Sequence, residues 1–559
     1  MEFLNNIIVV GKENTTTGVV SSPHYLATEV GVKLLVKGGN AFDAAVGVSL
    51  AIGVVQPYLS GIGGGGSITF YTKEGLCGCY QGRGSAPALL DLSQFIDEDG
   101  VPDYALARSG SIACVVPSLV PTLMMMHDDL GVLPWKTVID CVIPLASEGF
   151  LADTFLAQRT GDVDARKKID SHNSSKLFSK RVQEGQRILQ LEMANTLDMI
   201  GDDSNEVKNG SIASSLSHLI QEKGGVLSVA DLEGYQPFKQ PLVEGKYRQW
   251  RILAPATPTI GALQVLLALH ILDNFQVDAY LYGSSQHLHL VAEALKLSFV
   301  ARGRLDDEQD AVSLGDYDKS AEMAQLIDLD SALDVDSLYG QSDNESCTSH
   351  FSVADREGNV VSQTQTIGGT FGSGVIDPVS GIVINNLIGD FSLRVGDITT
   401  QGIRYGSYNL LSPGLEPASS QSPIIAINMD DGQILTVGAA GGPKIVSASL
   451  QAVVNYIDFG LGIKGSVDAA RLHCHGQQLE VESGISLAIQ SELSEMGHDI
   501  VNVPRIALLQ MICKSAVGWE GASDPRGPGR ASILIEEQGH IVSRDFGYSN
   551  TKLYRGKQL

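Results

Sequence analysis

Residues 348–375 constrain the fold more than any other part of this chain. They read TSHFSVADREGNVVSQTQTIGGTFGSGV, so polar and apolar residues alternate on both sides of the turn-forming run DREGN at residues 355–359. Alternation with a period of two around such a turn is typical of a β-hairpin. With the turn centred near Glu357, Thr348 lies opposite Thr366, and such side chains are about 5 Å apart at Cβ.

The facing hydroxyls of Thr348 and Thr366 allow two interpretations. The second hydroxyl can hydrogen-bond the first and orient it as a nucleophile. A Thr-Thr pair is also an ordinary strand stabiliser. The hairpin alone leaves both interpretations open.

Seven segments that occur in order along the chain decide between them. They are the run SSPHYLATEVGVKLLVKGGNAFDAAVGVSLAIGVVQPYLSGIGGGGS, the acidic stretch that ends at Cys347, TSHFS, NNLIGDFS, PASSQSP, GAAGGPK and ASDPR. This set resembles the γ-glutamyltransferase (glutathione hydrolase) family of N-terminal-nucleophile amidohydrolases, from about residue 18 to residue 532. The resemblance implies an enzyme with an α+β fold, a four-layer αββα sandwich of two antiparallel sheets between helical layers.

The resemblance also implies a precursor that cuts itself between Cys347 and Thr348. The Thr348 hydroxyl attacks the preceding carbonyl, an N-to-O shift gives an ester, and water releases a chain that begins with Thr348. That chain has both a nucleophile and a free α-amine with a pKa of roughly 8, which serves as a base. Residues 1–347 would form a large fragment and residues 348–559 a small catalytic one, together one interleaved heterodimeric unit.

Four residues match the family's substrate site. Arg83, in QGRGSAP, matches the arginine that clamps the substrate α-carboxylate, a task that suits a planar guanidinium. Ser419 and Ser420, in PASSQSP, match the serines that donate to the same carboxylate, and Asp390, in NNLIGDFS, matches the group that holds the α-ammonium. Without the resemblance, these would be a surface arginine, turn residues and a turn cap.

Gly441 and Gly442, in GAAGGPK, match the two backbone N–H donors that stabilise the oxyanion. Losing one such donor typically costs about 3 kcal/mol of barrier. His350 shares a strand face with Thr348, so it has a possible acid-base role that the free α-amine makes unnecessary.

Two positions depart from the family pattern. Gly368 stands where an Asn is usual, and Leu387 stands where an amide or acid is usual. We expect Gly368 to add room and Leu387 to add apolar surface near the α-amino group. The alternatives are therefore a relative that hydrolyses another carboxylate-bearing amide, of the oxamate amidohydrolase or glutaryl/cephalosporin acylase type, and a non-catalytic binding relative. Retention of Thr348, Thr366 and Arg83 argues against the last.

The amino-acid composition and short motifs limit the classes of partner and cofactor that we expect. A net charge of −25 disfavours nucleic acid and anionic membranes, which need clustered Lys and Arg. The motifs CGC at residues 77–79 and HCH at 473–475 lack zinc-site spacing, and the GxGxxG at 61–66 precedes a strand-like run, so we expect no metal and no cofactor. The expected partners are a γ-glutamyl or related amide, and water, an amino acid or a peptide as acceptor.

The same sequence predicts a location and several elements. Seven scattered cysteines suit a reducing compartment, residues 1–14 lack a basic start, and the longest apolar stretch, residues 44–55, is too short for a membrane span, so we expect a cytoplasmic protein.

Residues 306–345 hold thirteen carboxylates and one Lys and are expected to form an acidic surface loop or a fragment tail. Periodicity predicts helices at 27–35, 41–53, 448–459 and 487–496, and strands at 67–71, 424–427 and 434–437.

Overall fold

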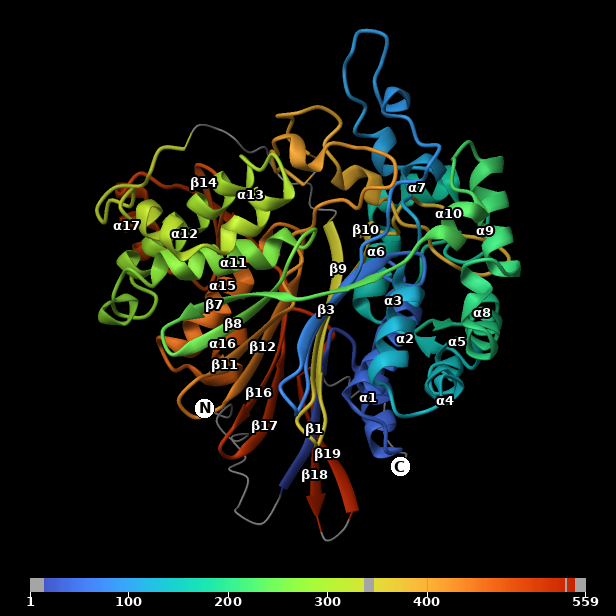
Figure 1. Cartoon of the computed structure of the whole chain (residues 1–559), viewed down its shortest axis with the longest axis horizontal. Coiled ribbons are helices and arrows are strands. Elements are labelled where there is room, and N and C mark those ends of the chain that lie inside the picture. Colours follow the sequence, from blue (N-terminus) through green and yellow to red (C-terminus); the bar gives the residue numbers. More distant parts are fainter. Residues whose placement is uncertain (1–14, 336–345, 400, 538–539, 548–559) are drawn as a thin grey trace.

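Two stacked antiparallel sheets lie between layers of helices in the computed structural model, which describes residues 15–335, 346–399, 401–537 and 540–547 (Figure 1). The eight-stranded sheet has the order β19 (His540–Gly547), β18 (Arg530–Glu537), β1 (Thr15–Ser22), β9 (Ser346–Ala354), β10 (Val360–Gly369), β2 (Gly65–Tyr71), β3 (Cys77–Gly82) and β6 (Phe238–Gln240). The six-stranded sheet has the order β17 (Gly518–Ser523), β16 (Leu508–Ser515), β12 (Ile434–Ala440), β11 (Ile424–Asn428), β8 (Trp250–Pro255) and β7 (Leu242–Tyr247). The predicted αββα sandwich is therefore confirmed.

Helices cover the outer face of each sheet, at the right and left of Figure 1. The eight-stranded sheet carries α1 (Tyr25–Val36), α2 (Ala41–Val55), α3 (Leu119–Leu130), α4 (Trp135–Asp140), α5 (Ile143–Ser147), α6 (Thr154–Gly161), α7 (Val163–His172), α8 (Leu191–Asp202), α9 (Ser211–Glu222) and α10 (Val229–Gly234) on its side. The six-stranded sheet carries α11 (Ile260–Leu272), α12 (Ser285–Arg302), α13 (Glu308–Val312), α14 (Tyr317–Ala324), α15 (Lys444–Ile457), α16 (Gly462–Asp468) and α17 (Leu487–Glu495). Smaller sheets are formed by β4 (Phe150–Leu151) with β5 (Arg187–Ile188), and by β13 (Leu472–Cys474), β14 (Gln478–Glu482) and β15 (Asp499–Val503).

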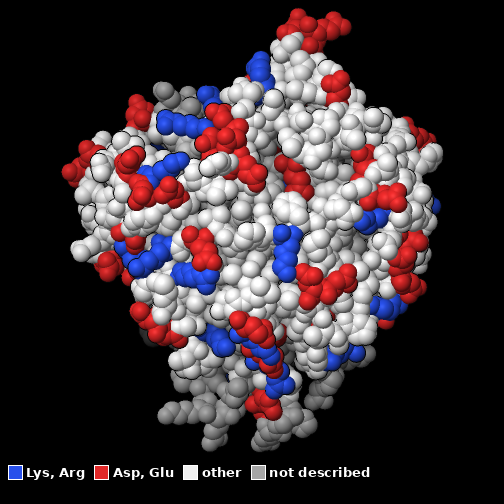
Figure 2. Space-filling view, viewed as in Figure 1, with Lys and Arg blue, Asp and Glu red and all other residues white. Residues whose placement is uncertain are grey.

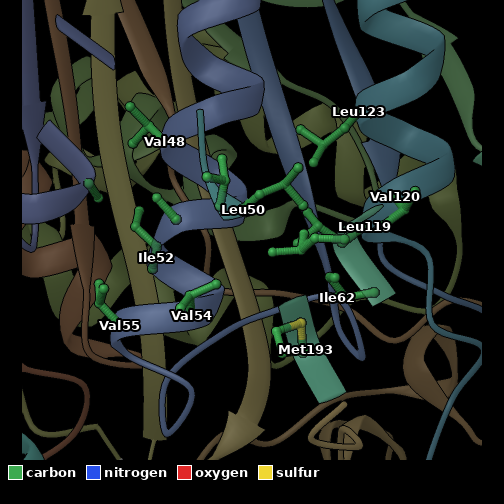
Figure 3. Close-up of a cluster of buried hydrophobic side chains, with 14 of the residues drawn as sticks. Val48, Leu50, Ile52, Val54, Val55, Ile62, Leu119, Val120, Leu123 and Met193 are labelled. Carbon is green, nitrogen blue, oxygen red and sulfur yellow. The ribbon is translucent and has the colours of Figure 1, made fainter. Parts of the chain in front are cut away.

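Apolar side chains fill each of the three spaces between these layers. The space outside the eight-stranded sheet is packed by the fully buried α2, whose Val48, Leu50 and Ile52 appear in Figure 3. Between the sheets lie residues such as Val19 and Ile425. A helix buried on all sides reads as a long apolar run, which is why residues 44–55 are apolar without crossing a membrane. Among the described residues, we find no helix both long enough and apolar enough to span a bilayer.

The hairpin turn is held by one carboxylate. Asp355 accepts hydrogen bonds from the backbone N–H groups of residues 357, 358 and 359 at 2.9–3.1 Å, as expected of an Asp that begins a turn. Its second oxygen accepts from the N–H of Ala41, the first residue of α2, at 3.0 Å. The hairpin is thereby fixed both in its own register and against the first helical layer.

The predicted elements are present, with one correction. The seven expected helices and strands correspond to α1, α2, α15, α17, β2, β11 and β12. The acidic stretch is not a loop over its first part: it forms α13 and α14, because Ala311, Leu314 and Ala324 are buried against neighbouring helices. Its end, residues 336–345, and the N-terminal residues 1–14 lie outside the described residues.

Candidate active site

Thr348 and Thr366 lie at an irregularity of the hairpin. β9 and β10 pair in the predicted register from Val360 with Ala354 to Gln365 with Ser349, and the register then shifts before Gly368 pairs with Cys347. The Thr366 hydroxyl donates to the carbonyl oxygen of Cys347 and accepts from the N–H of Gly368 at 2.9 Å. The second hydroxyl therefore polarises the peptide bond that precedes Thr348.

Close backbone contact supports this corner. A Cβ at Gly64, immediately before β2, would lie 2.1 Å from the carbonyl oxygen of Thr366. Any side chain there would displace β10, so the glycine run at residues 61–66 serves close approach, as predicted, and it continues into a strand.

Thr348 is 7% exposed and lies between two cavities. The small cavity is lined by Arg83, Thr348, Thr366, Gly368, Asp390, Gln401, Ser419, Ser420, Gln421, Gly442 and Ile445. The large cleft, of about 660 Å³, is lined by residues that include Cys347, Thr348, Gly441 and Lys444. A nucleophile at this position can cleave an amide whose two halves occupy the two cavities, one on each side.

Arg83 and Asp390 face each other in the small cavity. Arg83 follows the end of β3, Asp390 ends a 3₁₀ turn at Leu387–Asp390, and the Nη2 of Arg83 contacts the Oδ2 of Asp390. Both side chains are buried. The Nε and Nη1 atoms of Arg83 have no hydrogen-bond acceptor among the described residues, so this guanidinium retains donors for an anion.

Several residues that the sequence did not single out hold the small cavity in shape. Gln401 donates to Asp390 at 2.5 Å. Arg302, on α12, donates to the hydroxyl of Ser420 at 2.8 Å and contacts the Tyr405 hydroxyl. Ser419 accepts from the backbone N–H of Gln421 at 3.1 Å. Ser420 is thus held by a residue from a distant part of the chain, and Ser419 by a residue two positions away.

A carboxyl–phenol pair supports the backbone at Arg83. Glu416 accepts from the hydroxyl of Tyr235 at 2.5 Å and from the N–H of Arg83 at 3.4 Å. Burial raises the pKa of the Glu416 carboxyl. Glu416 is therefore a positioning residue for Arg83.

Gly441 and Gly442 form the tight turn between β12 and α15, with φ angles of +143° and +59°. Gly441 lines the large cleft and Gly442 lines the small cavity. Neither N–H donates to an acceptor among the described residues. Two free N–H groups beside Thr348 at the start of a 14-residue helix suit a developing negative charge.

The model of the Gamma-glutamyltranspeptidase family matches residues 27–534. The chain belongs to this family. The glutathione hydrolase proenzyme of Escherichia coli (strain K12) is 31% identical over 527 residues, which covers 91% of this chain and 90% of that relative. The Acylase ACY 1 proenzyme of Pseudomonas sp. (strain V22) is 30% identical over 506 residues and 88% of each chain.

Solved structures agree with the fold. A cephalosporin acylase from Bacillus halodurans superimposes with a TM-score of 0.78 at 24% identity, over 93% of this chain and 96% of that one. The gamma-glutamyltranspeptidase of Helicobacter pylori matches 56% of this chain and 91% of that one, with a TM-score of 0.53 and 28% identity. The family and its fold make this chain an N-terminal-nucleophile hydrolase.

The structure corrects both expectations about the departures from the γ-glutamyltranspeptidase pattern. Gly368 does not add room, because a Cβ there would lie 2.0 Å from the Oδ1 of Asn386, and its φ of +96° favours glycine. Asn386 accepts from the N–H of Gly369 at 2.8 Å. Leu387 is fully buried in an apolar cluster with Phe95 and does not line the small cavity.

His350 is held between the two sheets. Its Nδ1 lies 2.8 Å from the hydroxyl of Thr364, and its Nε2 lies 3.4 Å from that of Ser352. Gly438 of β12 leaves the space for the ring, since a Cβ there would lie 2.2 Å from the ring carbon Cε1. Burial lowers the pKa of His350 to about 3, so the ring is a neutral structural group.

One cluster among the described residues has the composition of a metal site. His289, Glu293 and His498 are buried with their ligand atoms within 4.8 Å of one another. The Nζ of the buried Lys296 lies 2.8 Å from Glu293, and His289 and His498 are hydrogen-bonded at 2.9 Å. An ammonium beside the carboxylate opposes a cation, so the cluster is better described as a buried polar network. All seven cysteines are free thiols, including those of the motifs at residues 77–79 and 473–475.

Proposed function

We propose that this chain is a γ-glutamyl amide hydrolase and transferase that cuts itself between Cys347 and Thr348. Residues 1–347 and 348–559 would then be the two fragments of a heterodimer. The observation that carries the proposal is the position of Thr348, which follows a polarised peptide carbonyl and lies between the buried Arg83 cavity and the large cleft. Seven free cysteines support a reducing compartment, and we infer the cytoplasm.

Self-cutting needs the neighbouring groups of residues 347, 348 and 366, and water. The Oγ1 of Thr348 attacks the carbonyl carbon of Cys347, whose oxygen accepts the Thr366 hydroxyl. The C–N bond breaks as the hydroxyl proton passes to the nitrogen, which leaves an ester between Cys347 and Thr348. Water then attacks the ester carbon, so Cys347 gains a carboxylate and Thr348 regains its hydroxyl beside a free α-amine.

The small cavity provides for the acyl half of the substrate. The free donors of Arg83, with the hydroxyls of Ser419 and Ser420, suit a carboxylate. Asp390 suits an ammonium, and its contact with Arg83 keeps a net charge close to zero in a buried site. Arg83 and Asp390 side by side therefore match the two charges of an α-amino acid head group.

Turnover repeats the same chemistry on a bound amide. The Oγ1 of Thr348 attacks the γ-carbonyl carbon, and the α-amine of Thr348 takes the hydroxyl proton and passes it to the leaving amine. The N–H groups of Gly441 and Gly442 stabilise the oxyanion before the C–N bond breaks. Water then releases the acid, whereas an amino acid or peptide amine accepts the acyl group.

A second candidate is an acyl donor with a carboxylate and no α-amine, as for a glutaryl or oxamate-type amide. It is favoured by the contacts of Asp390, whose oxygens are already engaged by Arg83 and Gln401. Comparison of γ-glutamyl and glutaryl anilides separates the two candidates, because Asp390→Asn lowers kcat/KM only for a donor that carries the ammonium. A stronger preference of the wild type for the glutaryl donor would replace the first candidate by the second.

Intact masses of the wild type and of Thr348→Ala test the proposal itself. The wild type should give two fragments that meet at Cys347 and Thr348 and should release amine from γ-glutamyl anilide and glutathione. Thr348→Ala should stay whole and inactive. A wild-type chain that stays whole after long incubation contradicts the proposal.

A further inference from the structure

The large cleft on the far side of Thr348 is strongly basic. Its lining includes Arg159, Lys444, Arg505 and Arg526 and contains no Asp or Glu. The whole chain has 64 acidic and 39 basic residues, and Figure 2 shows both kinds dispersed over the visible face. Four cations in one cleft of such a protein form a local positive potential that attracts anions.

Two of these cations have acidic partners, and two do not. Lys444 lies 2.5 Å from Glu480, and Arg526 lies 2.6 Å from Glu482. Arg159 and Arg505 are half-buried, and their side chains form no hydrogen bond or ion pair with any residue that the structure describes. Their donors are therefore available to a ligand.

Arg159 and Arg505 also act on each other. Burial lowers the pKa of Arg505 and the positive charge of Arg159 lowers it further, whereas the negative charge of Asp524 acts in the opposite direction. Two like charges in a partly buried site destabilise each other until an anion lies between them.

Both arginines line the cleft that Thr348 also lines. Arg159 lies on α6, whose first turn is capped by Asp153. Arg505 lies between β15 and β16, two residues before Ala507, whose Cα would be 3.0 Å from a Cβ on Gly441. The pair thus belongs to the half of the site opposite Arg83, where the amine half of the amide must lie.

We propose that Arg159 and Arg505 bind the carboxylate of the amine that leaves or accepts the acyl group. This inference rests on the proposed function and assigns to these two residues the selection of an amine half that carries a free carboxylate. Guanidinium groups bind a carboxylate through paired N–H donors, which a neutral or aromatic amine cannot use. Arg83 holds one end of such a substrate and the arginine pair holds the other.

The test compares three donors with one acyl group: γ-glutamyl-alanine, γ-glutamyl-alanine amide and γ-glutamyl anilide. Arg159→Gln and Arg505→Gln should each raise the KM for γ-glutamyl-alanine about tenfold, the usual effect of losing a charge-assisted hydrogen bond. Both variants should leave kcat/KM for the amide and the anilide close to wild type. Lys167→Gln, an exposed charge on α7, is the matched control and should change none of the three. Equal effects on all three donors, or no effect, would overturn the inference.

Calorimetry keeps the inference testable if the wild type turns over no γ-glutamyl donor. Alanylglycine and its C-terminal amide are then titrated into the wild type and both arginine variants. Carboxylate-dependent binding that both variants weaken supports the anion site even though the proposed function has failed. Absent binding, equal binding of acid and amide, or binding that the variants leave unchanged overturns it.

Discussion

Thr366→Val tests the role of the second hydroxyl in self-cutting. Valine keeps the branched shape of threonine and removes the donor to the Cys347 carbonyl oxygen. As the attack proceeds, that oxygen becomes an oxyanion, and loss of one preorganised donor to an oxyanion costs about 3 kcal/mol. The rate of cutting should therefore fall by about 100- to 1,000-fold.

The assay is the fraction of intact chain over time, measured by mass spectrometry after purification in the cold. Thr370→Val is the matched control, because its hydroxyl contacts the thiol of Cys347 at 3.0 Å and not the carbonyl. This control should cut at nearly the wild-type rate, and Thr366→Ser should recover most of the activity.

The valine also leaves the N–H of Gly368 without its acceptor, which costs about 1–3 kcal/mol of folding stability. A thermal melt therefore accompanies each rate, so that unfolding is not mistaken for slow cutting. Wild-type cutting kinetics in a folded Thr366→Val protein would refute the reasoning.

Four further predictions concern binding, stability and pH. Arg83→Gln should raise the KM for carboxylate-bearing acyl donors at least tenfold in steady-state assays, because a buried charge-assisted contact is lost. Asp355→Ala should lower the free energy of unfolding by about 2–4 kcal/mol in urea titrations, since four backbone N–H groups lose a bond to the carboxylate. The kcat/KM of the cut enzyme should rise through a pKa near 8, that of the Thr348 α-amine, and His350→Gln should leave this pKa in place. The pKa of His350 in the folded protein, about 3, lies below its value in the unfolded chain. The buried neutral ring therefore contributes stability above about pH 6.5, and this stability is lost as the pH falls towards 3. Denaturation at several pH values would detect the loss.

The sequence predicted the hairpin and its register but not the feature that matters most for chemistry. Alternation places Thr366 opposite Thr348, whereas the register shift after Gln365 turns the Thr366 hydroxyl to the carbonyl of Cys347. A bulge depends on packing from another strand, here the approach of Gly64, and leaves no trace in the alternation.

Residues that support the site were missed for a related reason. Arg302 reaches Ser420 across 118 positions, and Glu416 reaches Arg83 across 333. Nothing local distinguishes a buried arginine or glutamate from an exposed one, so only the tertiary structure reveals these contacts. The acidic stretch at residues 306–345 was wrongly predicted to be a loop throughout. The few apolar residues that pack its helices against their neighbours, such as Leu314, are outnumbered by carboxylates.

Strand order has a consequence for the lifetime of the mature protein. β1 lies between β18 and β9, and β8 pairs with β11, so each sheet contains paired strands from both sides of residue 347. Once the chain is cut as proposed, unfolding frees two polypeptides, and refolding requires them to meet again. The melting temperature of the cut protein then depends on its concentration, and in dilute solution its survival is governed by the rate of unfolding rather than by an equilibrium.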